Sequence, residues 1–303
     1  MEEIIRLTAF KWLEDQVRIH GDVLPRKLLE QGFEFRGQKI TLVGPQGIWK
    51  PKIFEQIPIS ITTVAGGPYD DAFSNEGFLL YRYRGTDPKH RDNVGLREAM
   101  REQTPLIYFH GIVRGKYLAV WPVFIIGDDP GRLSFTVAVD DSASIHEHIN
   151  KSSEHKSKIA EADMYFKRKY ITSTIRQRLH QKSFRERVLE AYREQCAFCR
   201  LKHSELLDAA HIIPDSDKLG EPTVSNGLSL CKIHHAAFDS NFIGVSPDFK
   251  IIVREDIRWE RDGPMLKYGI QQLHDKRIIL PRNRKLWPDQ ARLETRFKKF
   301  IGA

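Results

Sequence analysis

Residues 196–239 read CAFCRLKHSELLDAAHIIPDSDKLGEPTVSNGLSLCKIHHAAFD and concentrate the metal-coordinating side chains of the chain. This segment contains all three cysteines of the protein and four of its twelve histidines. Thiolates and imidazoles at close spacing are ligands that transition metals prefer. We therefore expect this segment to form a metal-stabilised core around which the rest of the chain is organised.

Two pairs of metal-ligating residues stand near the two ends of the segment. Two residues separate Cys196 from Cys199, and two separate Cys231 from His234. Three thiolates and one imidazole complete a tetrahedral shell around Zn²⁺ and leave no open position, which is typical of a structural site. Such a site contributes folding free energy to a segment too short to bury a core of its own. The sequence therefore predicts a structural zinc ion here.

Acids, an amide and further histidines lie around these pairs: Asp208, His211, Asn226, His235 and Asp239. In this order they resemble the HNH nuclease motif of the ββα-metal fold, over about residues 185–257. The resemblance implies that His211 is the general base and that His235 binds a catalytic metal. Asn226 would either orient His211 or hold the strand connection. Phosphodiester hydrolysis needs such a base, and a divalent ion that stabilises the developing charge.

The carboxylate ligand of this catalytic ion is open between two positions. Asp239 follows His235 by four residues and would share its helical face, and Asp208 precedes His211 by three. Many HNH sites carry an acid or a histidine directly before the base, where this chain has Ala210. The expected ion is Mg²⁺, Mn²⁺ or another divalent cation.

The first 140 residues alternate short β-branched and aromatic runs with Gly, Pro and Asp turns, which predicts a β-barrel with flanking helices. The expected strands lie in KITLV, PISITTV, GFLLYRYRG, LIYFHGIV, KYLAVWPVFII and RLSFTVAV. Helices are expected at 4–19, at 25–31 and, after a cap at Asp92, at 94–101. With the zinc-stapled segment, the predicted fold class is α+β.

Two pieces of this half are more specific, GPQGIWKP (44–51) and AGGPYDDAFSNEGFLLYRYRG (65–85). They resemble the SRA domain, the modified-base reader of methylcytosine-binding proteins, over about residues 40–140. Reading a base modification inside a duplex requires that the nucleotide be flipped out and held between aromatic rings. The resemblance therefore implies an SRA/PUA-like barrel with a base pocket.

Motif positions assign that pocket to two tyrosines and one carboxylate: Tyr69, Tyr83 (or Tyr81 if the strand register shifts by two) and Asp71 (or Asp70). A carboxylate can accept a hydrogen bond from the cytosine amino group. The chain departs from the family pattern at Pro68 and at Arg84. In the loop that follows, Lys89, His90 and Arg91 are candidates for contacting the phosphates or the gap left by the flipped base.

Residues 141–182 are expected to form a basic helical linker between a reader at 1–140 and a nuclease domain at 183–303. From Lys151 to Glu205, fourteen Lys and Arg residues stand against seven Asp and Glu, and neutralisation of phosphates drives nucleic-acid binding. Lys167, Arg168 and Lys169 are candidate backbone contacts. Ser183 and Glu186 form a capping-box pattern, which predicts that a helix begins there.

With both resemblances, the order of domains in the chain resembles that of McrA-type, modification-dependent restriction endonucleases, which have SRA and HNH domains. They imply cleavage of double-stranded DNA at a site marked by a flipped 5-methylcytosine or 5-hydroxymethylcytosine. One HNH site cuts one strand, so a homodimer or two binding events would make a double-strand break. The alternatives are an HNH nickase or homing-type nuclease that ignores modification, and a modified-DNA binding protein whose nuclease has decayed.

Bulk properties restrict the setting. The formal net charge is +8, and no apolar run approaches the roughly 20 residues that span a bilayer, so no membrane partner is expected. An odd number of cysteines, two of them in a CxxC pattern, argues against a disulfide framework. We therefore expect the protein in the reducing cytoplasm of a prokaryotic cell.

Overall fold

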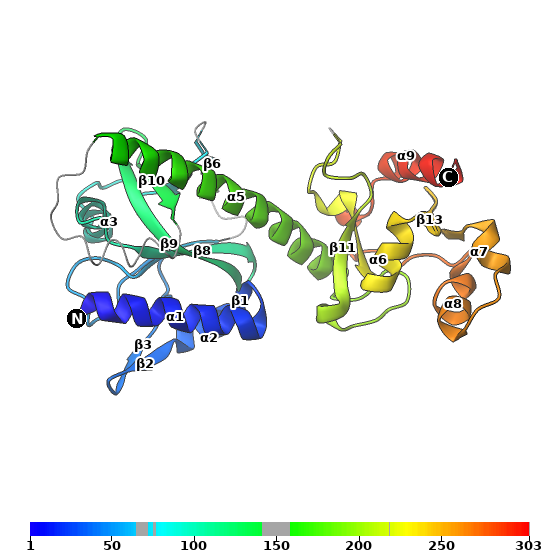
Figure 1. The fold of residues 1–303 in the computed structure, drawn as a ribbon, viewed down its shortest axis with the longest axis horizontal. Coiled ribbons are helices and arrows are strands. Elements are labelled where there is room, and N and C mark those ends of the chain that lie inside the picture. The colour runs from blue at the N-terminus through cyan, green and yellow to red at the C-terminus, as the bar shows by residue number, and fades with distance from the viewer. Residues whose placement is uncertain (65–71, 75–76, 141–157, 218, 303) are drawn as a thin grey trace. The chain divides into compact units, whose positions relative to one another are not determined.

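The computed structural model of the chain describes residues 1–64, 72–74, 77–140, 158–217 and 219–302. The chain forms two compact units, Met1–Leu179 and His180–Ala303. Helix α5 (Lys158–Ala191) contributes residues to both of them (Figure 1). The predicted domain boundaries after residues 140 and 182 stay predictions. None of the helices within these described ranges is long and apolar enough to cross a lipid bilayer.

A mixed eight-stranded sheet is the framework of the first unit. Its strands follow the order β4-β5-β8-β9-β10-β7-β6, and β1 also pairs with β9. Only β5 and β8 run parallel among the pairs that the structure describes. The bounds are β1 (Val23–Pro25), β4 (Ile48–Trp49), β5 (Ser60–Thr63), β6 (Ala72–Phe73), β7 (Leu79–Arg82), β8 (Leu106–Val113), β9 (Lys116–Asp129) and β10 (Ser134–Val139). Strands β4 and β6 end the order, so the predicted barrel takes the form of a half-barrel.

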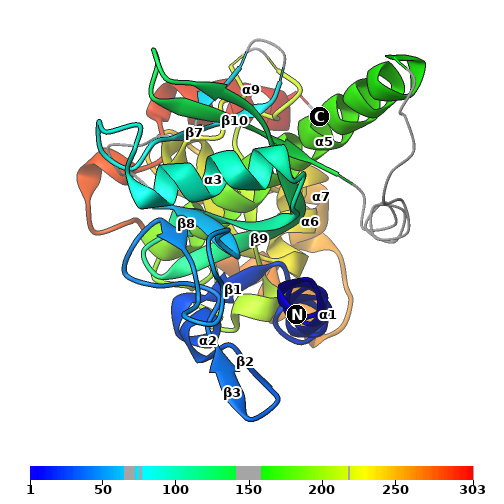
Figure 2. The same ribbon diagram turned by 90° about the vertical axis from the view of Figure 1, so that its left-hand side faces the viewer.

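Helices cover both faces of this sheet (Figures 1 and 2). Helices α1 (Glu2–His20) and α2 (Arg26–Gln31) lie on one face, and α3 (Arg91–Arg101) and the start of α5 lie on the other. Successive side chains of β8 point to opposite faces of the sheet, so the strand contributes to the hydrophobic core on both faces. Ile107 and Phe109 pack with α1, while Leu106 and Tyr108 pack with α3. A hairpin of β2 (Phe33–Phe35) and β3 (Gln38–Ile40) stands apart from the sheet.

Two helix starts differ from the predictions. Helix α3 begins at Arg91, because the His90 Nδ1 accepts a hydrogen bond from the Asp92 amide at 3.2 Å and so acts as the cap. The predicted capping box at Ser183 is wrong, since α5 runs through that residue without a break. Helical propensity on both sides of Ser183 continues the helix, and the serine then has no free amide to cap.

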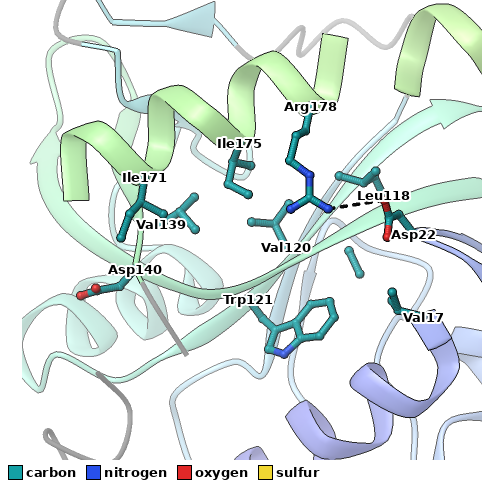
Figure 3. A pocket seen from close by; sticks show the side chains of 11 residues that line it. Val17, Asp22, Leu118, Val120, Trp121, Val139, Asp140, Ile171, Ile175 and Arg178 are labelled. Carbon is teal, nitrogen blue, oxygen red and sulfur yellow. Dashed lines mark hydrogen bonds and ion pairs between the residues drawn. The ribbon is translucent and has the colours of Figure 1, made fainter. Parts of the chain in front are cut away.

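A cavity of about 340 Å³ lies beside β9 in the first unit (Figure 3). On that side of β9 the pairing with β1 ends at Leu118 and the pairing with β10 begins at Val123. Apolar side chains line most of the cavity, and an ion pair of 3.5 Å between Arg178 and Asp22 closes one end. Neither Tyr81 nor Tyr83 lines it.

The second unit is built on a ββα element. Strands β11 (Leu207–His211) and β12 (Gly227–Cys231) pair antiparallel, and α6 (Lys232–Asp239) follows directly. A second hairpin, β13 and β14, and short helices complete the unit. These later elements are β13 (Ile243–Val245), β14 (Ile251–Val253), α7 (Glu255–Trp259), α8 (Pro264–Gly269) and α9 (Gln290–Ile301), with single 3₁₀ turns at Ser204–Leu206, Val224–Asn226, Gln271–Leu273 and Arg284–Leu286.

The C-terminal helix α9 packs on β13 through two apolar side chains. Leu293 and Phe300 are buried, whereas Ile301 is 69% exposed. The reason is the approach of α9 to β13, where Gly244 leaves the space that the Phe300 ring fills.

Candidate metal centre and active site

The β11–β12 pairing sets the separation of the candidate groups. Leu207 pairs with Cys231 at one end of the hairpin, and His211 pairs with Gly227 at the other. Helix α6 begins immediately after Cys231, so its first turn carries both His234 and His235. The cysteine cluster and the candidate catalytic residues therefore use one small hairpin–helix scaffold.

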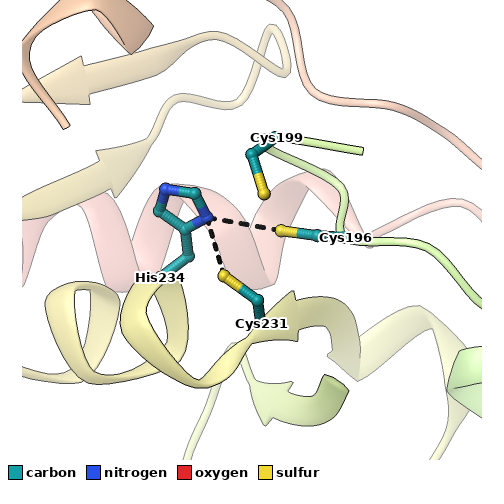
Figure 4. Close-up of side chains that lie close together, drawn as sticks. All are labelled: Cys196, Cys199, Cys231 and His234. Atoms are coloured by element: carbon teal, nitrogen blue, oxygen red, sulfur yellow. Dashed lines mark hydrogen bonds between the residues drawn. The ribbon is translucent and has the colours of Figure 1, made fainter. Parts of the chain in front are cut away.

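Cys196, Cys199, Cys231 and His234 come together as the sequence predicts (Figure 4). One ligand atom from each lies within 4.8 Å of all the others. The His234 Nδ1 is 3.4 Å from the Cys196 Sγ and 3.2 Å from the Cys231 Sγ. A tetrahedral site with metal–ligand bonds of about 2.0–2.3 Å has edges of about 3.5–3.8 Å. The four residues therefore fit a small tetrahedral cation and could bind a metal ion.

The electrostatics of the cluster suit a metal as well. Hydrogen bonds from Cys196 and Cys199 lower the pKa of the Cys231 thiol, and the thiolate is the form that binds metals. The Nε2 of His234 is 2.7 Å from the carbonyl oxygen of Gly269. A hydrogen bond from that nitrogen fixes the ring and leaves Nδ1 free to coordinate.

His234 and His235 are adjacent but face different groups, as the sequence predicts. Successive side chains on a helix are about 100° apart. His234 is buried among the thiols. His235 instead lies between two carboxylates, with its Nδ1 3.4 Å from the Asp208 Oδ2 and its Nε2 3.2 Å from the Asp239 Oδ2. Both carboxylates that the sequence left as alternatives thus reach the same imidazole.

The charges around His235 create a site for a cation. Hydrogen bonds with Asp208 and Asp239 raise the pKa of His235 to about 9. Burial alone would raise the pKa of Asp208, but its hydrogen bond with His235 lowers it. The two carboxylates lie at opposite ring nitrogens, and a carboxylate with an imidazole nitrogen is a ligand pair that Mg²⁺ or Mn²⁺ accepts. A bound divalent ion would displace the proton of His235.

His211 has the environment of a neutral base. Its ring stacks on Phe184 with centroids 4.0 Å apart, and its Nε2 is buried without a hydrogen-bond partner among the described residues. Burial lowers the pKa of His211, so the imidazole is uncharged at neutral pH and able to accept a proton. This pKa also depends on the charges of three nearby residues, Asp208, His235 and Asp239. His211 is therefore close enough to the carboxylate pair to interact with it electrostatically.

Asn226 holds the connection between the two strands. Its side-chain oxygen accepts from the Ile213 amide at 2.9 Å, and its amide donates to the carbonyls of Ile213 and Glu221, each at 3.0 Å. Among the described residues, its side chain makes no hydrogen bond with His211. Of the two roles that the sequence leaves open, the geometry supports the second.

Two residues of α5 near this site were missed by the sequence reasoning. Phe184 stacks on His211, and Arg185 donates to the carbonyls of Ser204 and Leu207 at 2.9 Å, just before β11. Gly227 allows this approach, since a Cβ there would lie 2.5 Å from Val188 and 2.9 Å from Phe184. The sequence does contain a signal for these two residues, because Phe184 and Arg185 belong to the predicted helix that leads directly into Cys196.

The predicted base pocket is described only in part. Tyr69, Asp70 and Asp71 lie outside the described residues. Tyr83 is buried, stacks on Phe135 with centroids 4.6 Å apart, and hydrogen-bonds with Asp128 and Arg97. Tyr81 is also buried, with its hydroxyl 3.4 Å from the Thr62 carbonyl. The pocket stays a prediction.

Arg84, a departure from the family pattern, links two loops. Its guanidinium hydrogen-bonds with Gln46 of the GPQGIWKP segment and with Asp92 at the start of α3. Its amide donates to the buried Asn93 side chain at 2.8 Å. The arginine therefore forms a structural bridge between the two loops at this position.

The predicted phosphate contacts fall into two groups. Lys89, Arg91 and Lys167 are exposed and Lys169 is half-buried, whereas His90 is engaged as the α3 cap. For Arg168 the prediction is wrong. It is 4% exposed, its Nε lies 2.9 Å from the Asp140 carboxylate, and its guanidinium stacks on Phe124. A buried ion pair cannot be broken without leaving an unpaired charge inside the unit.

One family model matches part of the second unit. The HNH endonuclease family matches residues 196–246. Among solved structures, the chain is similar to a modification-dependent TagI restriction endonuclease, at 15% identity over 94% of this chain and 89% of that chain, with a TM-score of 0.31. No curated protein gives a significant match.

Two further solved structures show weaker similarity. The SRA domain of SUVH5, in a complex with methylated DNA, is 16% identical over 36% of this chain and 84% of that chain, with a TM-score of 0.23. The type IV phosphorothioation-dependent restriction endonuclease ScoMcrA is 14% identical over 80% of this chain and 57% of that chain, with a TM-score of 0.21. TM-scores this low carry no functional conclusion.

The family match coincides with the residues that the geometry brings together. It begins at Cys196 and extends past Asp239, so it includes the Cys₃His cluster, His211, Asn226 and the acid–histidine group. The predicted HNH nuclease is confirmed. The chain carries an HNH endonuclease domain and is a DNA endonuclease of that type.

Proposed function

We propose that the protein is a modification-dependent restriction endonuclease that hydrolyses double-stranded DNA. The observation that carries the proposal is the placement of His235 between Asp208 and Asp239, within electrostatic reach of the neutral His211. A base and a cation site that interact electrostatically provide both requirements of phosphodiester hydrolysis.

In the proposed reaction, His211 takes the proton of a water molecule that attacks the phosphorus. His235, Asp208 and Asp239 would hold Mg²⁺, Mn²⁺ or another divalent cation, which stabilises the charge on the phosphate and on the leaving oxygen. Asn226 keeps the β11–β12 connection in shape. Ala210 is fully buried, and the two carboxylates beside His235 supply a ligand set that does not need it. This supports an active enzyme over a decayed one.

The Cys₃His cluster would hold Zn²⁺ in a closed shell and act in folding only. The first unit would flip a modified cytosine, 5-methylcytosine or 5-hydroxymethylcytosine, into a pocket formed by the segments that resemble the SRA domain. Exposed Lys89, Arg91 and Lys167 would contact the DNA backbone. Function in the reducing cytoplasm of a prokaryotic cell is consistent with thiolate ligands.

A plasmid cleavage assay tests the proposal. Plasmids carrying cytosine, 5-methylcytosine or 5-hydroxymethylcytosine are incubated with the protein and Mg²⁺ or Mn²⁺, with His211→Ala as the control. We expect cutting of a modified plasmid only, its loss in a chelator, and a fall of at least about 100-fold in the variant. Equal cutting of all three plasmids would favour the modification-independent nuclease. Tight binding of modified DNA without cutting would favour the decayed enzyme.

A further inference from the structure

One arginine lies near the Asp208 carboxylate, and another contacts the backbone at Asp239. The Nε of Arg185 lies 3.8 Å from the Asp208 Oδ1. Arg296 donates to the carbonyl of Phe238 at 2.7 Å and to that of Asp239 at 3.4 Å. Arg185 comes from α5 and Arg296 from α9, so both arginines stand outside the ββα element that carries the candidate ligands.

Arg185 anchors the turn that leads into β11. One terminal nitrogen donates to the carbonyls of Ser204 and Leu207, each at 2.9 Å, and the other contacts the carboxylate of Glu186. The guanidinium is only 28% exposed. Both terminal nitrogens bond within the protein, and the planar fork fixes the backbone directly before Asp208. A lysine cannot reproduce two such bonds at this geometry.

Arg296 anchors the end of α6 in a similar way. Its guanidinium lies over the Phe238 ring, 4.8 Å from the centroid, and donates to carbonyls at the C-terminus of the helix, where the Phe238 carbonyl also accepts from the Asn241 amide at 3.2 Å. A cation at this end is also favoured by the helix dipole. These contacts fix the last turn of α6, from which Asp239 reaches back to His235.

We propose that Arg185 and Arg296 are positioning residues that hold Asp208 and Asp239 at the two ring nitrogens of His235, where a carboxylate and the imidazole bind a divalent cation. The inference rests on the proposed metal-dependent hydrolysis. Arg185 acts through the Asp208 carboxylate and the backbone before it, and Arg296 acts through the backbone of the last turn of α6. Groups that orient metal ligands from outside change metal affinity by about 10–100-fold, so the site should need these two anchors to bind its metal at low concentration.

The test compares Arg185→Lys and Arg296→Lys with Arg277→Lys. Arg277 also donates to a backbone carbonyl of the same unit, that of Asp248 at 3.4 Å, and serves as the matched control. The readouts are the Mn²⁺ concentration for half-maximal cleavage, kcat at saturating Mn²⁺, the Kd for DNA and the Tm. We expect the first two variants to need about 10-fold more Mn²⁺. At saturation their kcat should largely recover, and their Kd for DNA should equal that of the wild type and of Arg277→Lys.

Three results would overturn the inference. Activation of both lysine variants at the wild-type Mn²⁺ concentration would show that the anchors do not act on the metal. A loss of activity that Mn²⁺ does not rescue, together with a lowered Tm, would mark a purely structural role. A shift in one variant alone would remove the other arginine from the proposal. If Arg185→Lys does not fold, Arg185→Gln takes its place. Metal-independent cleavage by the wild type would instead contradict the proposed function.

Discussion

One ring contact sets the proton chemistry of the candidate base. His211 must be neutral to accept a proton, and its burial against Phe184 lowers the pKa. Protonation at low pH removes the base, so kcat/KM should fall only below about pH 6.5, the ordinary histidine pKa, and stay level above it. Phe184→Ala opens the ring to water, and the acid limb should move up towards pH 6.5.

The measurement is kcat/KM against pH at saturating metal for the wild type, Phe184→Ala and Phe297→Ala. Phe297 stacks on Phe300 of α9, so its removal takes away a ring without touching His211. An acid limb that stays in place in Phe184→Ala would show that the stacking does not control the base.

At the scale of elements, the Cys₃His cluster joins the segment before β11 to the junction of β12 and α6. Cys196 and Cys199 precede β11, while Cys231 and His234 join β12 to α6. Removing one thiolate should release the bound metal and unfold the second unit, because a structural zinc site contributes folding free energy directly. For Cys231→Ser we expect less than one zinc per chain by elemental analysis and rapid proteolysis after residue 180. The wild type should keep its zinc in excess Mg²⁺. A wild type that purifies with no metal and stays folded would contradict this.

The elements were predictable where a local pattern decides them. Alternation found β8, β9 and β10, and CxxC with CxxH found the cluster, because both signals lie in neighbouring residues. The role of Arg168 and the course of α5 through Ser183 were not predictable in the same way. Arg168 belongs to a basic run, yet Asp140, distant in sequence, pairs with it in the interior. The anchors Arg185 and Arg296 likewise depend on tertiary contacts that spacing does not reveal.

For the whole molecule, the number of cuts depends on the number of HNH sites at the DNA. One chain carries one group of His211, His235, Asp208 and Asp239, and one such group cuts one strand. A supercoiled plasmid with a modified site should therefore first give a nicked circle and then, in a second event, the linear form. The nicked form should accumulate most when protein is scarce relative to DNA, because the second event then needs another protein molecule.

Gel analysis of a time course at several protein concentrations measures both products. Linear product without a nicked intermediate at every concentration would mean that two chains act as a preformed homodimer, and ultracentrifugation of the free protein would then show a dimer.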